Sequence, residues 1–196
     1  MDNTENKELF LSTFRKNVQR PGAEKLLAWM ETTDFFTAPA STRFHAAYEG
    51  GLLDHSMNVY NVLISKHFDP ASDDIESFTI VSLLHDLCKA NYYKKGTRNV
   101  KNDATGQWEK VPSYSVEDLF PYGHGEKSVF LIERFMKLHI EEAVAIRWHM
   151  GGFDDAARGG CFAISEAYDK YPLAVKLHIA DLEATYLMEH RTSAVR

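Results

Sequence analysis

The sequence predicts an all-α protein, one helical bundle into which a small β-hairpin is inserted. Apolar residues recur at helical spacing along most of the 196 residues. A single stretch, 92–114, instead combines a turn cluster with short alternating flanks, which is typical of a hairpin. No internal repeat, linker or low-complexity segment divides the chain. We therefore expect one domain over 1–196, with N-terminal helices in 1–43 and a helical core in 44–190.

The N-terminal part is expected to contain two helices and an irregular connection. Apolar residues at helical spacing predict a first helix over Asn6–Val18, which Pro21 and Gly22 end. Pro21 also suits the first turn of a second helix, which runs through Leu26–Trp29. Residues 33–43 lack a periodic pattern and indicate the connection.

Two strong helices follow in the core. The first is predicted over Gly51–Phe68 from its apolar periodicity. Asp73 or Asp74 is expected to cap the second, which continues to about Ala90.

The second half of the chain contains the hairpin and then helices again. The hairpin turn is predicted at the cluster Asn-Asp-Ala-Thr-Gly, residues 102–106. Four further helices are expected from periodicity, over 127–138, 140–150, 159–168 and 171–189.

Composition narrows the class of protein. Asp and Glu number 28 against 22 Lys and Arg, so the formal net charge is −6 and a coat for duplex DNA is not expected. No apolar run approaches the roughly 20 residues that span a bilayer, and the N-terminus lacks the layout of a signal peptide. Two cysteines, Cys88 and Cys161, are too few for a disulfide framework. We expect a cytoplasmic protein with reduced thiols and no membrane partner.

Several polar residues stand where the apolar rhythm predicts a buried helix face. His55 follows Leu-Leu-Asp, and the pair His85-Asp86 lies within Leu-Leu-His-Asp-Leu. His149 ends an apolar run, and Asp181 lies within Ile-Ala-Asp-Leu. Burying a carboxylate costs several kcal/mol unless it is paired, hydrogen-bonded or bound to metal. These positions therefore indicate a polar site inside the bundle.

Imidazoles and carboxylates together suit divalent Mn, Fe, Co, Ni or Zn, and Mg is also possible. A pair of ions needs about six or seven protein ligands with at least one bridging carboxylate, and Asp86 has two oxygens for that role. Neighbours on a helix point about 100° apart, so both His85 and Asp86 can reach an ion beside their helix. Six residues supply the expected set: His55, His85, Asp86, His124, His149 and Asp181.

A single histidine on a helix is more often an ordinary core or surface residue than a ligand. We assign His67, His139, His178 and His190 to that class. His178 precedes Asp181 by three residues and so shares its side of the helix. The metal prediction rests on the order of separated elements, because a His-Asp dipeptide alone has little specificity.

That order resembles the HD-domain superfamily of metal-dependent phosphohydrolases, whose motif is H…HD…D on a helical bundle. The stretch His45-Ala-Ala-Tyr-Glu-Gly-Gly-Leu-Leu-Asp-His55-Ser is similar to the superfamily's HHAYxGGLLEHS-type opening, and His85-Asp86-Leu-Cys-Lys89 is similar to its HDxxK element. Gly-His124-Gly-Glu-Lys-Ser and Arg-Trp-His149 resemble the two further histidine elements of binuclear members. The resemblance covers roughly residues 44–187.

The resemblance implies hydrolysis of a nucleotide-type phosphoester or phosphoanhydride by metal-activated water. It implies that one ion is held by His55, His85, Asp86 and Asp181, and that Asp86 bridges to a second ion held by His124 and His149. Asp86 and Lys89 are the expected catalytic residues. Cys88 departs from the small residue common at its position. Two alternatives remain open: a non-catalytic metal-bound regulatory or ligand-sensing module, and a di-iron oxygenase of the same fold.

Basic residues suggest where the substrate lies. The candidate phosphate contacts are Lys89, Lys94, Arg98, Lys127 and Arg147. The segment from Lys89 to Lys110 has six basic residues against two acidic ones, and Tyr92, Tyr93 and Trp108 offer flat surfaces for a base. We therefore expect a small phosphorylated partner, a nucleotide or a short oligonucleotide. Two interpretations of the hairpin stay open: it guides this partner toward the metals, or it is a solvated hairpin whose aromatic rings pack on the bundle. The natural substrate, the metal and the oligomeric state stay open at this point.

Overall fold

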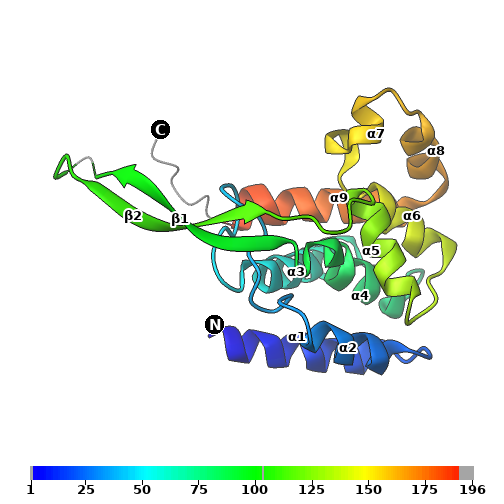
Figure 1. Cartoon of the computed structure of the whole chain (residues 1–196). Helices are drawn as coiled ribbons and strands as arrows, with labels where there is room; N and C mark the ends of the chain where they lie inside the picture. The colour runs from blue at the N-terminus through cyan, green and yellow to red at the C-terminus, as the bar shows by residue number, and fades with distance from the viewer. Residues whose placement is uncertain (1, 103, 190–196) are drawn as a thin grey trace.

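The computed structural model describes residues 2–102 and 104–189, which form helices and one antiparallel hairpin (Figure 1). The helices before the hairpin are α1 (Asn3–Asn17), α2 (Ala23–Glu31), α3 (Gly51–Val62) and α4 (Ile75–Leu84). Those after it are α5 (His124–Glu133), α6 (Ile140–Trp148), α7 (Asp155–Arg158), α8 (Ala163–Lys170) and α9 (Pro172–Glu183). The expected all-α class with an inserted hairpin is confirmed.

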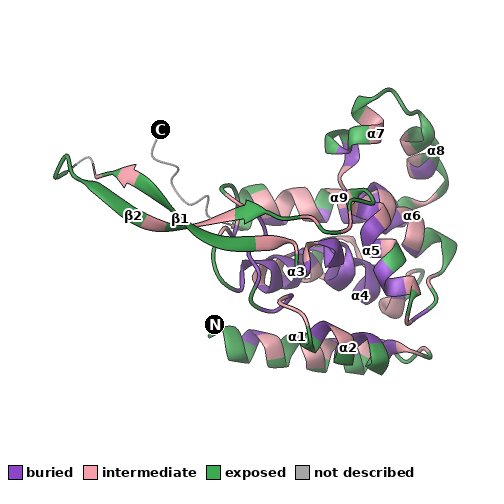
Figure 2. Ribbon diagram, viewed as in Figure 1, coloured by how far each residue is buried: buried purple, intermediate pink, exposed green. Residues whose placement is uncertain are grey.

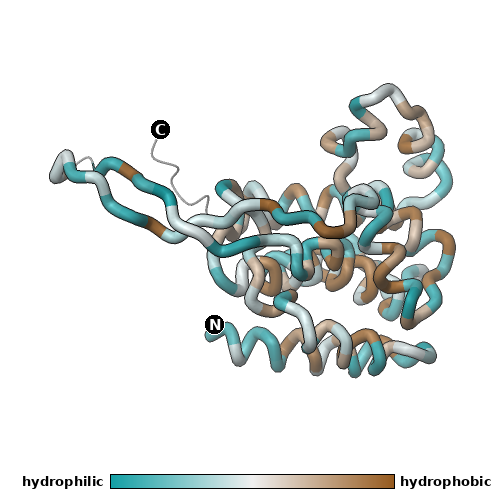
Figure 3. The backbone as a smooth tube through the Cα atoms, in the orientation of Figure 1, coloured by the Kyte–Doolittle hydropathy of each residue, from teal (hydrophilic) through white to brown (hydrophobic). Residues whose placement is uncertain are grey.

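Helix α4 forms the centre of the bundle. Eight of its ten residues are buried, and it packs against α1, α3, α6 and α9 (Figure 2). A helix that is apolar on all sides is stable only when neighbours surround it, and the hydropathy of α4 fits that position (Figure 3). Because α4 is central, the residues that follow its last turn enter the interior rather than the solvent.

The N-terminal helices cover one side of this core. α1 packs on α3 and α4, and α2 lies beside it (Figure 1). The connection between them carries Arg20, whose guanidinium contacts Glu76 of α4 at 3.2 Å and Glu142 of α6 at 2.7 Å. Pro21 lies before α2, whose N-cap is Gly22, so its expected place in the first turn of that helix is wrong.

The end of α4 differs most from expectation. Asp74 caps the helix as predicted, since its carboxylate accepts hydrogen bonds from the backbone of Glu76 and Ser77. The helix ends at Leu84, however, and not near Ala90. His85 and Asp86 therefore follow the helix, and a 3₁₀ turn begins at Leu87.

Other boundaries shift by a few residues. α3 and α9 each continue into a π-helical turn, Leu63–His67 and Ala184–Met188, so both predicted helices have nearly their expected lengths. α5 begins at His124 rather than 127, and α8 ends at Lys170 rather than 168. The short helix α7 was not predicted.

The hairpin is a long arm. Strand β1 (Tyr93–Lys101) pairs antiparallel with β2 (Trp108–Val116), from Tyr93 opposite Val116 at the base to Lys101 opposite Trp108 near the tip. The arm projects away from the helices and is mostly exposed (Figures 1 and 2). It extends two residues beyond the predicted 92–114.

The predicted division into parts stays a prediction. Its helical core, 44–190, includes His190, and its hairpin includes Asp103; both residues lie outside the described part of the chain. Among the helices that the structure describes, none is long and apolar enough to cross a membrane.

Candidate metal centre

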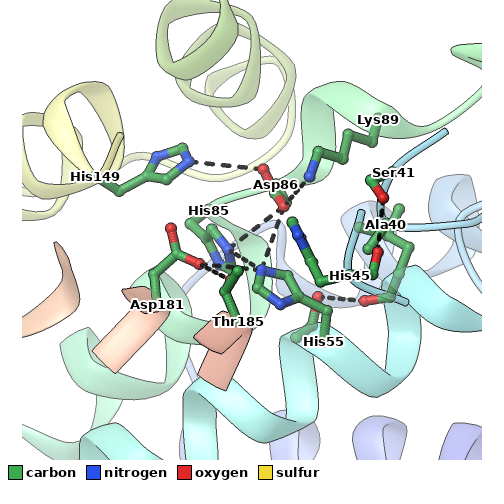
Figure 4. A network of polar contacts seen from close by, with 12 residues as sticks. Ala40, Ser41, His45, His55, His85, Asp86, Lys89, His149, Asp181 and Thr185 are labelled. Atoms are coloured by element: carbon green, nitrogen blue, oxygen red, sulfur yellow. Dashed lines mark hydrogen bonds and ion pairs between the residues drawn. The ribbon is translucent and has the colours of Figure 1, made fainter. Parts of the chain in front are cut away.

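All six predicted ligands converge on one buried cluster, and Figure 4 labels each of them except His124. They come from five segments of the chain, the longest separation being that between His55 and Asp181. His55 lies on α3, His85 and Asp86 follow α4, His124 begins α5, His149 follows α6 and Asp181 lies on α9.

Asp86 stands in the middle of the cluster. Its Oδ1 lies 2.8 Å from Nε2 of His124 and 3.6 Å from Nε2 of His149. Its Oδ2 lies 3.5 Å from Nε2 of His55 and 3.6 Å from Nε2 of His85. One carboxylate thus presents each of its oxygens to a different pair of imidazoles.

Asp181 closes the cluster on the side of α9. Its Oδ1 lies 3.3 Å from Nε2 of His55. Asp181, His85 and His149 also present ligand atoms within 4.8 Å of one another, which is close enough for a shared cation. The buried His and Asp groups can therefore hold a metal ion.

The backbone sets the tautomer of two of these histidines. Nδ1–H of His85 donates to the carbonyl of Ser82 at 2.8 Å, and Nδ1–H of His149 donates to that of Ile146 at 2.7 Å. Because a carbonyl only accepts, the proton in each of these hydrogen bonds lies on Nδ1, and Nε2 of each ring faces the cluster. Nε2 of His149 is buried with no hydrogen-bond partner among the described residues, as expected of a ligand atom.

The other two histidines have side chains as outer partners. Nδ1 of His55 lies 2.9 Å from Oε1 of Glu189, whose side chain is only 3% exposed. Nδ1 of His124 lies 3.4 Å from the sulfur of Cys88. Outer carboxylates and carbonyls orient metal-binding imidazoles and raise their basicity. Three of the four histidines thus have a strong oxygen acceptor, and His124 alone has a sulfur.

Neighbouring charges keep the carboxylates of the cluster ionised. They also keep His55 and His124, the two histidines with side-chain partners on Nδ1, protonated. Burial opposes the charge of Asp86, yet Lys89 and His85 hold its pKa well below the usual value. Burial also opposes protonation of His55, but hydrogen bonds to Asp181 and Glu189 raise its pKa to about 10. The pKa of His124 likewise rises to about 10, because Cys88 and Asp86 outweigh burial. In the metal-free protein, His55 and His124 are therefore protonated, and a metal ion would have to displace a proton from each ring.

Two close backbone approaches place these side chains. A Cβ at Gly125 would lie 2.4 Å from the carbonyl oxygen of Arg147, so only glycine lets α5 approach α6 at this point. That approach brings His124 to His149. A Cβ at Gly51 would lie 2.0 Å from the carbonyl oxygen of Ala46, so the start of α3 fits tightly against the preceding loop.

The cluster forms the floor of a cavity of about 620 Å³. Lys89 reaches it from the 3₁₀ turn after α4, and its Nζ lies 2.6 Å from Oδ2 of Asp86 (Figure 4). Tyr92 and Tyr93 bring the base of the hairpin to the wall. Arg158 also lines this cavity from α7, and its side chain is exposed.

The remaining predicted phosphate contacts lie elsewhere. Lys127 and Arg147 line a neighbouring cavity, where each is paired: Lys127 with Asp118 at 2.7 Å, and Arg147 with Asp154 at 2.9 Å. Lys94 and Arg98 lie on exposed strand β1 and line neither cavity. The neighbouring cavity is also lined by Lys89 and His124, so it adjoins the cluster, but of the five predicted cations Lys89 alone lines the main cavity.

Sequence reasoning missed two residues of the cluster. His45 and Glu189 form a further group with His55, within 4.8 Å of one another, and both His45 Nε2 and Glu189 Oε2 are buried without a partner among the described residues. His45 stands in the HHAY-type stretch, so the motif carried a signal for it. Glu189 lies 134 residues from His55, and no motif in the sequence pointed to it.

His178 is also closer to the site than expected. Its Nδ1–H donates to the carbonyl oxygen of His149 at 2.6 Å, and its ring lines the main cavity. It is a supporting residue of the cluster rather than an ordinary core histidine.

Comparison with known proteins adds no assignment: no family model, curated protein or solved structure matches this chain. The chemistry of the site is therefore argued from its own geometry.

Proposed function

We propose that the protein is a metal-dependent phosphohydrolase of the HD-domain type, acting on a nucleotide-type phosphoester or phosphoanhydride. The observation that carries the proposal is the position of Asp86, whose two oxygens face two separate pairs of imidazoles. A carboxylate in this position would suit a pair of divalent ions. His55, His85, Asp86 and Asp181 would hold one ion, and Asp86, His124 and His149 the other.

Bound there, the ions would supply a hydroxide at neutral pH and polarise the phosphoryl group. The side chains of the cavity would bind the phosphoryl group and stabilise its charge. Lys89, fixed at the cavity wall by the short turn after α4, donates to a non-bridging phosphoryl oxygen and offsets its developing charge. Overall, the oxygen of one water would bond to phosphorus as the P–O bond to the leaving group breaks, and one proton of that water would end on the leaving oxygen.

The cavity walls favour a nucleotide over a bare phosphate. Phe44 lines the cavity with its side chain 66% exposed, and Phe153 lines it with 46% exposed. Exposed aromatic faces beside a phosphate site suit stacking with a base. Arg158 lies over the ring of Phe153 at 5.8 Å, where its guanidinium can meet a second phosphate.

The test is hydrolysis under anaerobic conditions with Mn²⁺ by protein purified without a histidine tag. A panel of nucleotides and a generic phosphodiester should show turnover that Lys89→Met lowers, mainly in kcat. Turnover without oxygen would contradict the oxygenase alternative. Metal binding with no turnover on any phosphoester would contradict our proposal and favour a sensing module.

We expect two ions per chain after reconstitution. His149→Ala should then retain about one, because the proposed assignment places His149 with His124 on the second ion, beside Oδ1 of Asp86. Elemental analysis of desalted protein measures this, and a wild-type maximum of one equivalent would contradict the two-ion assignment. His178 is unsuitable as a control because it holds the carbonyl of His149. His139→Asn is suitable, since His139 caps the far end of α6, about 15 Å away, and asparagine preserves the cap.

Metal binding is expected to release protons. The pKa values of His55 and His124 are about 10 in the metal-free protein, so both rings are charged at pH 7 and must lose a proton to coordinate. Metal affinity should therefore rise with pH from 7 toward 10. Calorimetry in buffers of different ionisation enthalpy should give about two protons released per chain at saturation. A pH-independent affinity with no proton release would refute the protonation assigned to these rings.

A further inference from the structure

The hairpin arm has two chemically different faces. In an antiparallel pair, directly opposed residues point to the same side, and sides alternate along each strand. The register therefore places two sets of side chains on opposite faces of the hairpin. One face carries Lys95, Lys101 and Lys110 with Tyr93, Trp108 and Tyr114. The other carries Lys94, Arg98 and Glu109 with small or aliphatic residues.

The first of these, which we call the aromatic–lysine face, alternates rings and cations from base to tip. Tyr114 lies opposite Lys95, and Trp108 lies opposite Lys101. Among the described residues of the two strands, no acidic side chain shares this face. Trp108 is 70% exposed, so most of its indole ring lies in solvent.

The cations of this face are available to a ligand. The structure describes no carboxylate partner for Lys101 or Lys110. Lys95 lies 3.0 Å from Glu49, but both side chains are 60% or more exposed, and such pairs contribute little. On the opposite face, Lys94 lies 3.4 Å from Glu117.

The face continues into the main cavity. Tyr93, at its base, lines the cavity, as does its opposite neighbour Val116. The hydroxyl of Tyr93 donates to the carbonyl of Ala40 at 3.1 Å, which ties the base of the arm to the wall. Nine residues of strand span about 30 Å, so the face leads from the metal cluster outward over the length of several nucleotides.

We propose that the aromatic–lysine face binds single-stranded nucleic acid and delivers its end to the metal cluster. Interleaved rings and cations are the features that hold a single strand, through base stacking and phosphate contacts. A two-stranded ribbon is strongly twisted, so the face winds around the arm, and a flexible strand can follow it where a rigid duplex cannot. The proposal rests on the proposed function for the chemistry in the cavity, whereas binding along the arm is tested without it.

The experiment measures fluorescence anisotropy of a labelled twelve-nucleotide oligothymidylate with full-length protein in EDTA, where no hydrolysis interferes. The wild type should bind it more tightly than the matching duplex. Three lysine contacts predict a slope of about −2 for log K against log salt. Lys101→Gln with Lys110→Gln should reduce that slope to about −0.7, and Trp108→Ala should weaken binding roughly tenfold.

The matched control is Lys94→Gln with Arg98→Gln, which removes the same charge from the opposite face and should change affinity less than twofold. Equal weakening by both double variants, or no binding by the wild type, would overturn the proposal. So would a wild-type dimer in sedimentation that Trp108→Ala dissociates, since the arm would then be a protein interface. All variants should hydrolyse a generic phosphodiester at the rate of the wild type. If the wild type itself lacks that activity, the proposed function is contradicted, but the result for binding along the arm still holds.

Discussion

Asp86→Asn should reduce kcat by about 10³-fold or more, equivalent to at least ~4 kcal/mol of transition-state stabilisation. The amide cannot present a charged oxygen to both pairs of imidazoles, so both ions should bind more weakly. Elemental analysis should show loss of metal in parallel with loss of turnover.

Asparagine is preferred to alanine at this position because Lys89 lies half-buried beside Asp86 and needs an acceptor. Circular dichroism should confirm that the variant is folded. Asp169→Asn is the matched control, since Asp169 is an exposed carboxylate on α8, and it should keep full activity. A folded Asp86→Asn protein with ordinary turnover would contradict the metal mechanism.

Arg20→Met should lower the free energy of unfolding by about 3–5 kcal/mol, because it leaves the buried carboxylate of Glu142 without its counter-charge. Glu142 is fully buried, and Arg20 donates to both of its oxygens, at 2.7 and 2.8 Å. Ser77 of α4 donates to the same carboxylate on α6, so the loss affects the contact between these two helices. Urea denaturation measures the change.

Two comparisons make the Arg20 result specific. Arg15→Met removes the exposed pair with Glu24 and should cost less than about 1 kcal/mol. Adding Glu142→Gln to Arg20→Met should recover part of the loss, since the uncompensated charge is gone. A loss of the same size in Arg15→Met and Arg20→Met would contradict a buried ionic clamp.

The helical elements follow largely from local pattern. Apolar spacing predicted α3, α6 and the helical character of the central α4, and a turn cluster predicted the hairpin, because these signals act within a few residues. Five of the six metal-ligating candidates were also recognisable, since a His or Asp within an apolar helical run stands out against its immediate neighbours. The element around His124 is not apolar and was singled out only by its resemblance to a family motif.

The end of α4 depended on tertiary contacts. The sequence Leu-Leu-His-Asp-Leu-Cys-Lys continues a helical rhythm, and nothing local ends it at Leu84. Asp86 is held instead by His124, 38 residues further along, at 2.8 Å. Such a contact outweighs the small local preference for one more helical turn.

The chain by itself determined which residues could bind metal, because residue type and local spacing suffice for that. Only the tertiary structure decided which oxygen of Asp86 faces which imidazole, and that Glu189 supports His55 across 134 residues. It also decided which lysines of the arm share a face with Trp108, because strand register depends on pairing between strands and not on either strand alone.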